Sequence, residues 1–267
     1  MQISIAMTFL APAFLMMTEV SAAGCAGVHQ VSSGPSAISI VELYTSEGCN
    51  SCPPADKWFS TLRLQKDGIV PLAFHVDYWD YIGWKDRFAK AEFSERQRES
   101  VRRHGGQTSY TPQVLINGQD QRRWSDQSQW SSILQKIVAR PPRANLALKF
   151  SVAPTSLDAA LAVTMPQFSD RADVAVFLAI TENNLSSRVT AGENRGTTLK
   201  HDHVVRAIIG PLSGDAKDRA EGKVVIKQPV TLERGWKRDD LSLVAFVQNL
   251  RTGEVYQALS TPICGNA

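Results

Sequence analysis

The sequence of 267 residues has no long run of Lys or Arg, and its 29 Lys+Arg nearly cancel its 26 Asp+Glu. Proteins that bind nucleic acid or an anionic membrane surface by electrostatics usually carry a basic stripe or patch, so the composition predicts no nucleic-acid partner. Internal repeats and low-complexity tracts are also missing. Since 43% of the residues are hydrophobic, the sequence predicts one or two globular domains with ordinary buried cores.

Long hydrophobic runs are missing as well. The apolar stretch Ile3–Met17 is broken by Ser4, Thr8 and Pro12, and it is shorter than the about 20 residues that a transmembrane helix needs. Small residues follow it up to Gly24. We therefore predict that residues 1–23 are a signal peptide, that the mature protein is periplasmic or secreted, and that it has no membrane span.

Cysteine is scarce, with four residues, which is too few for a small scaffold held together by disulfides. Cys25 and Cys264 stand alone near the two ends of the chain. Because the termini of compact chains often lie close together, we predict a Cys25–Cys264 disulfide in an oxidising compartment. The alternative for Cys25 is a lipid anchor, since the preceding segment partly resembles a lipoprotein signal, although Ala22 stands where that signal normally has Leu.

Residues 24–140 alternate between short β-rich runs and amphipathic helical runs. The order β-α-β-α-β-β-α predicts a parallel βαβ unit followed by a hairpin around Asn117-Gly118, that is, an α/β domain with a mixed sheet and flanking helices. The predicted strands are Ser39–Tyr44, Ile69–Val76, Gln113–Ile116 and Gln121–Trp124, and the predicted helices are Ala55–Lys66, Ser94–His104 and Gln127–Ala139.

Residues 141–267 have a different texture, which begins after Pro141-Pro142. Seven strand-like runs at fairly even spacing predict an all-β, sandwich-like domain, with Ala191–Lys200 as a polar loop between strands. The predicted strands are Leu146–Val152, Leu157–Thr164, Val174–Thr181, His203–Ile209, Lys223–Val230, Leu241–Gln248 and Val255–Ser260.

Cys49 and Cys52 form a Cys-x-x-Cys pair between a predicted strand and a predicted helix that begins near Pro53-Pro54. Free N–H groups and the dipole at a helix start favour a thiolate. We therefore expect Cys49 to be the more exposed, nucleophilic cysteine and Cys52 to resolve a mixed disulfide, with a Cys49–Cys52 disulfide in the oxidised state.

Three stretches around this pair resemble proteins of the thioredoxin fold. Val41–Thr45 leading to Cys49 resembles the first strand and active-site turn of glutaredoxins, and Cys52-Pro53-Pro54 is similar to thioredoxin-like chains. Thr111-Pro112 stands at the thioredoxin-fold position where a cis-proline faces the cysteines. The resemblance implies that Pro112 shapes a groove in which the backbone of Thr111 binds an extended client segment.

The mature chain as a whole resembles a secreted thioredoxin-like family of unknown function. The motifs that carry this resemblance are the insertion His75–Trp84, the segment Ala191–Gly196 and the triplet His201–His203. It implies a thioredoxin-like domain over residues 24–140 and an exported protein. It implies no substrate, so function has to be argued from the site.

The site predicts an exported thiol–disulfide oxidoreductase acting on a cysteine-containing protein or a small thiol. No organic cofactor is implied, because the dithiol itself carries the reducing equivalents. Asn50-Ser51 matches none of the common dipeptides between such cysteines, which leaves the direction of transfer open. Thioredoxins also place a buried carboxylate six residues before the first cysteine; here Leu43 stands there, and Glu42 is expected to face the other side of the strand.

Two other classes of function compete with the enzyme. Cys49, Cys52 and His75 together would suit Cu(I), as in a copper-handling protein, and a permanent Cys49–Cys52 bond would give a redox-inert binding module. Our preferred interpretation assigns no metal.

Several further residues have two interpretations each. Tyr78 and Trp79 are either a peptide-contacting rim, and so candidate substrate-binding residues, or part of the core. His201 and His203 are expected on one face of a strand, with a packing role favoured over metal binding. Glu193–Arg195 is either a functional loop or a turn that contacts the other domain, and the β-rich half is expected to be a docking or structural module.

Overall fold

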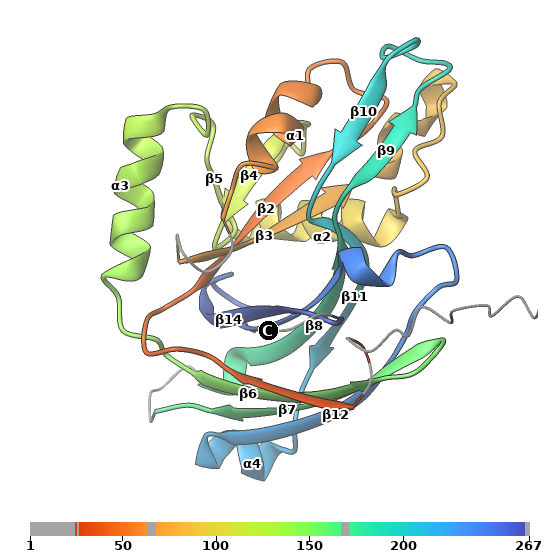
Figure 1. Ribbon diagram of the computed structural model, residues 1–267. Coiled ribbons are helices and arrows are strands. Elements are labelled where there is room, and N and C mark those ends of the chain that lie inside the picture. The colour runs from red at the N-terminus through yellow and green to blue at the C-terminus, as the bar shows by residue number, and fades with distance from the viewer. Residues whose placement is uncertain (1–24, 26, 64–67, 167–170, 265–267) are drawn as a thin grey trace, which may run out of the picture.

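A computed structural model describes residue 25 and residues 27–63, 68–166 and 171–264, so the predicted signal peptide lies outside the described residues. Over these residues the fold is mixed α/β and mostly β, with three sheets and four α-helices (Figure 1). The strands are β1 Val28–Ser32, β2 Ser39–Thr45, β3 Ile69–His75, β4 Gln113–Ile116, β5 Gln119–Asp120, β6 Asn145–Val152, β7 Ser156–Thr164, β8 Val174–Glu182, β9 Leu185–Arg188, β10 Thr198–His201, β11 Val204–Leu212, β12 Lys223–Thr231, β13 Leu241–Asn249 and β14 Val255–Pro262. The α-helices are α1 Pro53–Phe59, α2 Ala91–Arg103, α3 Gln127–Val138 and α4 Ala216–Glu221, and the 3-10 helices are η1 Asp77–Ile82, η2 Arg171–Asp173 and η3 Arg238–Asp240.

From β2 onward the first half follows the predicted order of helices and strands; β1, which was not predicted, pairs antiparallel with β6 in the sheet of the second half. β2 and β3 are fully buried and parallel, and β4 pairs antiparallel with β2. The turn at Asn117 (φ 51°) and Gly118 (φ 75°) reverses the chain in two residues, as hairpin turns with two left-handed residues do. Strand pairing therefore resumes directly after the turn, with Ile116 opposite Gln119. The strand predicted at Gln121–Trp124 is wrong, because β5 lies earlier, at Gln119–Asp120.

Two helices differ from the prediction at their ends. α1 stops at Phe59 instead of running to Lys66, and the hydroxyl of Thr61 donates to the carbonyl oxygen of Trp58 at 2.6 Å. Such side-chain bonds compete with continued helix. α2 begins at Ala91, so Ser94 lies inside the helix rather than capping it, and its hydroxyl donates to Asp77 Oδ1 at 2.5 Å.

In the second half all seven predicted strands are present, while the predicted loop at Ala191–Lys200 is partly wrong. Its last residues belong to β10, which pairs antiparallel with β9 as a separate two-stranded sheet. The placement of His201 and His203 on one strand is also wrong, because His201 ends β10 and His203 lies in the turn before β11 with φ 58°.

The largest sheet crosses the predicted domain boundary at residue 140. Its strand order is β14-β13-β8-β11-β3-β2-β4-β5, so strands of the second half continue directly into those of the first. The junction is parallel pairing of β11 with β3 at Val204–Ala73, with the Ala73 N–H donating to the His203 carbonyl oxygen at 2.8 Å. The two-domain description therefore fits this fold only loosely.

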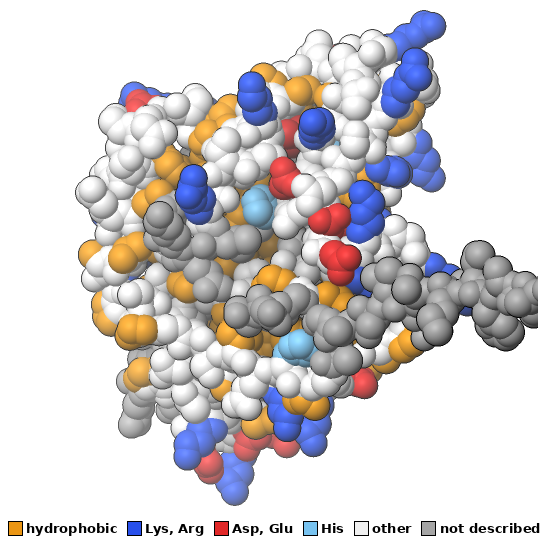
Figure 2. Space-filling view, viewed as in Figure 1, with side chains coloured by type: hydrophobic (Ala, Val, Ile, Leu, Met, Phe, Trp, Pro, Cys, Tyr) orange, Lys and Arg blue, Asp and Glu red, His pale blue; other side chains and the backbone are white. Residues whose placement is uncertain are grey.

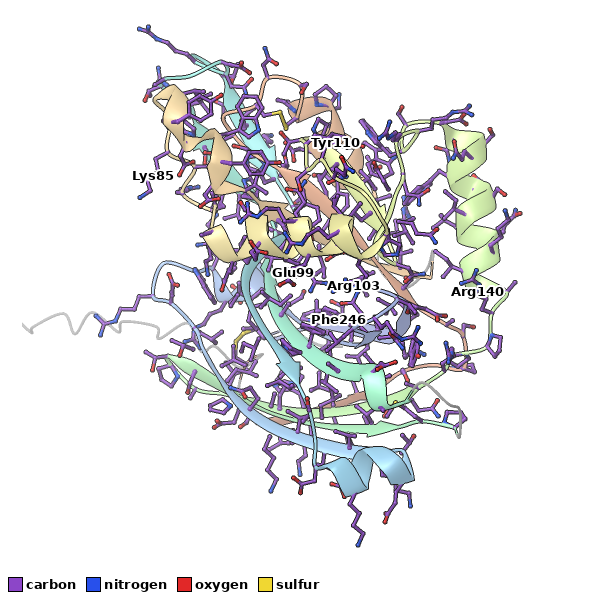
Figure 3. All side chains as sticks on the ribbon, turned by 180° about the vertical axis from the view of Figure 1, so that it is seen from behind. Lys85, Glu99, Arg103, Tyr110, Arg140 and Phe246 are labelled. Carbon is purple, nitrogen blue, oxygen red and sulfur yellow. A yellow bond between two sulfur atoms is a disulfide. The ribbon has the colours of Figure 1, made fainter. Side chains whose placement is uncertain are left out.

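Three large apolar clusters fill the space between the layers, and a fourth, small one consists of Phe88, Leu185 and Val204. The first lies between the sheet β1-β6-β7-β12 and strands β8, β13 and β14, and includes Leu148, Leu161, Leu178 and Leu243. The second joins the two ends of the large sheet beneath α2, and combines residues such as Phe74 with Phe177 and Phe246; Figure 3 shows Phe246 below α2. The third packs α1 and α3 on β2 and β4, with Phe59, Trp130 and Val114 among its members.

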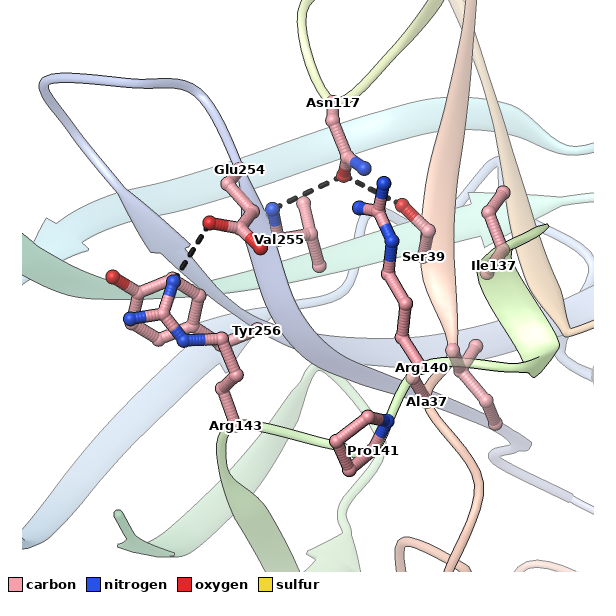
Figure 4. Close-up of a pocket in the computed structure, with 11 residues that line it drawn as sticks. Ala37, Ser39, Asn117, Ile137, Arg140, Pro141, Arg143, Glu254, Val255 and Tyr256 are labelled. Carbon is pink, nitrogen blue, oxygen red and sulfur yellow. Dashed lines mark hydrogen bonds and ion pairs between the residues drawn. The ribbon is translucent and has the colours of Figure 1, made fainter. Parts of the chain in front are cut away.

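Asn117 ties the two ends of the curved sheet together. Its Oδ1 accepts from the Ser39 hydroxyl at 2.7 Å and from the Val255 N–H at 3.1 Å, in a cavity also lined by Arg140 and Arg143 (Figure 4). These bonds connect β14 to the start of β2 without strand pairing between them.

Cys25 and Cys264 are joined by a disulfide with a Cα–Cα distance of 4.2 Å, and both pack against the first apolar cluster. A sulfur held in this bond is not available for a lipid anchor, the alternative that the sequence left open for Cys25. None of the helices in the described part of the chain is long and apolar enough to cross a membrane.

Candidate functional site

The candidate site is built around a disulfide between Cys49 and Cys52, whose Cα atoms are 5.5 Å apart. Cys52 is the residue before α1, and Pro53 opens the helix. The N–H groups of Ala55 and Asp56 donate to the Cys52 carbonyl oxygen at 2.9 and 3.1 Å. The pair therefore stands at the turn between β2 and α1, as predicted from the spacing.

The exposure predicted for Cys49 is wrong, because both cysteines have 0% of their surface exposed. The loop of residues 191–196, which connects β9 to β10, is hydrogen-bonded to the backbone on both sides of Cys49. Asn194 Nδ2 donates to the carbonyl oxygens of Glu47 and Cys49 at 2.9 and 3.0 Å, and Glu193 Oε2 accepts from the Asn50 N–H at 3.0 Å. Glu193 and Asn194 thus bind the cysteine loop directly.

The predicted groove residues lie on another side of the cysteine loop. Thr111-Pro112 is a cis peptide at the start of β4. Trp79 of η1 donates from Nε1 to Thr111 Oγ1 at 2.7 Å, and a Cβ placed on Gly48 would lie 3.1 Å from the Trp79 Cβ. Trp79 therefore bridges the cysteine loop and the cis-proline turn.

The aromatic insertion serves in part as core. Tyr78 and Trp79 are half-buried against the second apolar cluster, and the Tyr78 hydroxyl donates to Gln97 Oε1 at 3.1 Å. Tyr81, in contrast, is 82% exposed, which leaves one aromatic side chain of the insertion open to solvent.

A buried cluster of ionisable side chains lies behind the cysteine loop; we call Glu47, Asp56, His75, Asp86 and His201 the buried acid–base cluster. His75 Nδ1 is 2.6 Å from Asp86 Oδ2, which also accepts from the Glu47 N–H at 2.9 Å. His201 Nε2 lies 3.3 Å from Glu47 Oε1, and the two imidazole rings are 4.8 Å apart.

Electrostatics within this cluster shift several pKa values. Burial lowers the pKa of His75, but the nearby Asp86 carboxylate outweighs burial and the net shift is upward. Burial alone would raise the pKa of Asp86, and the charge of His75 reverses this to a net decrease. The pKa of Asp56 is raised, chiefly by burial. His75 and Asp86 are therefore an ion pair in which each stabilises the charged form of the other.

Three imidazole nitrogens of the cluster, His75 Nε2 and both nitrogens of His201, are buried and have no hydrogen-bond partner among the described residues, and the same holds for Glu47 Oε1. Buried polar atoms are normally paired, so these four atoms are exceptions within the described part of the chain. His203 is separate from the cluster and packs edge-on against Phe59 of α1.

Sequence reasoning missed most of the cluster. Asp56 could have been predicted from the sequence, because it follows Cys52 by four residues and positions four apart share one face of a helix. Glu42, as predicted, faces the other side of β2, where Arg96 Nε donates to its Oε1 at 2.7 Å beneath α2.

The geometry gives no support to the copper hypothesis for Cys49, Cys52 and His75. The two sulfurs that would bind copper are bonded to each other. Across the described residues, the one group of three or more possible metal ligands with atoms within 4.8 Å of one another is Cys25, Asp239 and Cys264, and its two sulfurs are bonded to each other.

Comparisons with known proteins place the fold and the family. The crystal structure of protein AGR_C_4864 from Agrobacterium tumefaciens is similar, with a TM-score of 0.62, 22% identity, and coverage of 88% of this chain and 98% of that one. HBP35 of Porphyromonas gingivalis has a TM-score of 0.63, 15% identity, and coverage of 86% and 76%. At these identities the likeness concerns the fold alone.

No curated protein matches the sequence. A family model described as "Protein of unknown function (DUF1223)" matches residues 40–248 and so includes the cysteine loop, the cis-proline turn and the loop of residues 191–196. The chain belongs to the DUF1223 family.

Proposed function

We propose that this protein is an exported thiol–disulfide oxidoreductase whose reactive centre is the Cys49–Cys52 pair. One observation carries the proposal: a disulfide between cysteines three residues apart lies in a loop that Trp79 connects to a cis-proline turn and whose Glu47 belongs to a buried acid–base cluster. Perturbed ionisable groups next to a reactive bond are typical of functional sites. Cys49 is assigned as the nucleophile and Cys52 as the resolving cysteine.

The arrangement of the first half supports the finer, thioredoxin-like classification as part of the same proposal. Elements β2, α1, β3, α2, β4, β5 and α3 follow in the order expected from the resemblance, and the strand order β3-β2-β4-β5 is mixed. The cis peptide at Thr111-Pro112 precedes β4 directly, which is where that fold requires it.

The proposed reaction is exchange with a dithiol client. A client thiolate attacks Cys49 Sγ, the Cys49–Cys52 bond breaks, and Cys52 leaves as a thiolate that takes up one proton. A second client thiolate then attacks the mixed disulfide, the client leaves oxidised, and Cys49 leaves as a thiolate that is protonated in turn. Since the sulfurs are covered, the loop of residues 191–196 has to move before a client reaches them.

The client is a cysteine-containing protein or a small thiol. On the face shown in Figure 2, Lys and Arg side chains are interspersed with Asp and Glu, so that face offers no field of one sign to select a polyanion.

The complete burial of both cysteines favours a second candidate, a permanent structural disulfide in a redox-inert module. The two functions differ in reduction potential. Equilibrating the full chain against a glutathione series and counting alkylated thiols by mass measures it. A value below about −300 mV is typical of structural disulfides, and a value between about −120 and −270 mV is typical of oxidoreductases.

A trapping experiment tests the assignment of the two cysteines. Cys52→Ala should accumulate a mixed disulfide through Cys49 when exposed to oxidised clients in a periplasmic or secreted extract, because nothing resolves it. Cys49→Ala is the matched control and should trap nothing. The enzymatic proposal would be contradicted if Cys52→Ala formed no adducts and the reduction potential lay in the range typical of structural disulfides.

A further inference from the structure

The β-rich half contributes a side chain to the acid–base cluster, through β10. This strand lies beside α1 (Figure 1) and ends at His201, which is 3% exposed. His201 faces Glu47 of the cysteine loop at 3.3 Å and the ring of His75 at the end of β3 at 4.8 Å between centroids. Residues about 150 positions apart thus meet behind one disulfide.

Asp56 connects this group to Cys52. The two residues are separated by one helical turn, and the Asp56 N–H is bonded to the Cys52 carbonyl oxygen, so their side chains point from the same face of α1. The Asp56 carboxyl is buried and lies within electrostatic reach of both His201 and His75. It is the acidic side chain of α1, whose other charged residue is Lys57.

A cavity between α1 and β10 connects these groups with the surface. Asp56 and His201 both line it, together with Lys57, Ser60, Lys200 and Asp202. Proton exchange with solvent on this side does not require the loop of residues 191–196 to open, because that loop covers the cysteine loop rather than this cavity.

Breaking the Cys49–Cys52 bond creates a Cys52 thiolate with no exposed surface, and an unpaired buried charge is unfavourable. The thiolate must therefore receive a proton from a neighbouring acid as the bond breaks, and that acid must regain it from solvent. In the reverse direction the same groups remove the proton.

We propose that His201 of β10 is a positioning residue for this transfer: it holds Asp56 in the state that exchanges a proton with Cys52, and Asp56 regains that proton from solvent through the cavity between α1 and β10. The inference rests on the proposed function and deepens it, because it makes the β-rich half part of the reactive site. The ionisable groups that face His201 are Glu47 of the cysteine loop, Asp56 of α1 and His75 of β3, and Asp86 is bound to His75. Lys57, Lys200 and Asp202 line the same cavity.

The test follows opening of the Cys49–Cys52 disulfide by dithiothreitol in the full-length protein, by rapid quenching with an alkylating agent, from pH 5 to pH 9. The rate constant of the wild type is divided by that of each variant at the same pH. The pH dependence that comes from the ionisation of dithiothreitol is the same for both proteins and therefore drops out of this ratio. His201→Gln and Asp56→Asn should each slow opening about 10-fold near pH 7, at the low end of what general acid–base groups contribute, and the ratio should change with pH.

His203→Asn is the matched control. It removes a neighbouring imidazole outside the cluster, and Asn tolerates the left-handed backbone at that position. Its ratio should stay near one at every pH. His201→Gln and Asp56→Asn lie on different elements, so the test can still be made if one of these two variants does not fold.

Ratios for His201→Gln and Asp56→Asn that stay constant over the whole pH range would overturn the inference, since they indicate a structural role only. That outcome leaves the proposed function intact if the wild-type disulfide opens and recloses. If dithiothreitol cannot open the wild-type disulfide in the folded protein, both the proposed function and this inference are wrong.

Discussion

At the scale of single residues, the His75–Asp86 contact, at 2.6 Å, is shorter than the His201–Glu47 contact, at 3.3 Å, behind the cysteine loop. Both side chains are fully buried and 2.6 Å apart, and Asp86 also accepts the N–H groups of Glu47 and Phe88 at 2.9 Å each. Removing one member of a buried ion pair leaves the other charge unpaired in a dry environment. The pair is therefore expected to matter for stability as well as for the site.

We expect Asp86→Asn to lower the free energy of unfolding at pH 6 by about 3–5 kcal/mol, the range found when a buried pair is broken. Urea denaturation of both proteins measures this. Glu92→Gln is a suitable control, because the Glu92 side chain is 55% exposed and its change should stay within about 0.5 kcal/mol. An equal effect of the two substitutions would contradict a buried, charged pair.

The same pair predicts a pH dependence. The raised pKa of His75 means that its contribution to stability is complete below about pH 6.5 and is lost as pH rises through the folded pKa. The lowered pKa of Asp86 means that its contribution is present above about pH 3.9 and is lost as pH falls through the folded pKa. The stability difference between wild type and Asp86→Asn should therefore be largest near pH 5–6 and smaller at pH 9. A difference that does not vary between these pH values would show that His75 is uncharged in the native protein.

Sequence alone could identify Cys49, Cys52, Thr111 and Pro112, because their signals are local spacings. It could not identify Glu47, Asp86 or His201 as one cluster. Each is an ordinary polar residue in its own segment, and only the pairing of β11 with β3 brings His201 beside His75. The burial of Cys49 was unpredictable for the same reason, because the loop bonded to its backbone is distant in the sequence.

At the scale of elements, we expect the loop of residues 191–196 to limit access to the disulfide, because Glu193 and Asn194 bind the cysteine loop. Gly192 in this loop has φ 71°, and a Cβ there would lie 3.1 Å from Ile82 Cδ1 and 3.3 Å from Trp84 Cβ. The loop is thus packed against the η1 insertion as well as bonded to the cysteine loop. Its position fits the second interpretation of Glu193–Arg195, a turn that contacts the other half of the chain.

Asn194→Ala should make the disulfide open faster. The substitution removes two hydrogen bonds to the cysteine loop, and at about 0.5–1.5 kcal/mol each their loss should raise the population of the open loop about 5-fold or more. Rates of reduction by glutathione measure the change. Arg195→Ala, at an exposed neighbouring position, should leave the rate unchanged. Equal rates for wild type and Asn194→Ala would show that this loop does not limit access.

Element boundaries were predictable where a local signal fixes them. Asn117-Gly118 sets the hairpin turn, and Asp126 caps α3 by accepting the N–H groups of Ser128 and Gln129. The β9–β10 hairpin was missed because Ser186 and Ser187 carry little strand signal. Its position beside α1 is a tertiary contact that no local pattern reports.

At the scale of the whole molecule, the Cys25–Cys264 disulfide joins residues 239 positions apart. Such a bond restricts the unfolded chain, so Cys264→Ala should lower the free energy of unfolding by about 2–5 kcal/mol. Guanidinium denaturation without reductant measures this. Cys25→Ala should give the same value, and the double variant should be no less stable than either single one, since all three lose one bond. Additive effects would indicate that the two cysteines act independently.

Because the large sheet contains strands from both halves, cutting the chain after Arg140 divides it. Such a fragment keeps every cysteine-loop residue, but it leaves β3 without its neighbour β11 and uncovers Phe74. Bare strand edges beside apolar surface recruit other strands, so we expect the fragment to aggregate. Truncation is therefore expected to fail as a way of isolating the half that carries the cysteine pair, because the second half completes the sheet of the first.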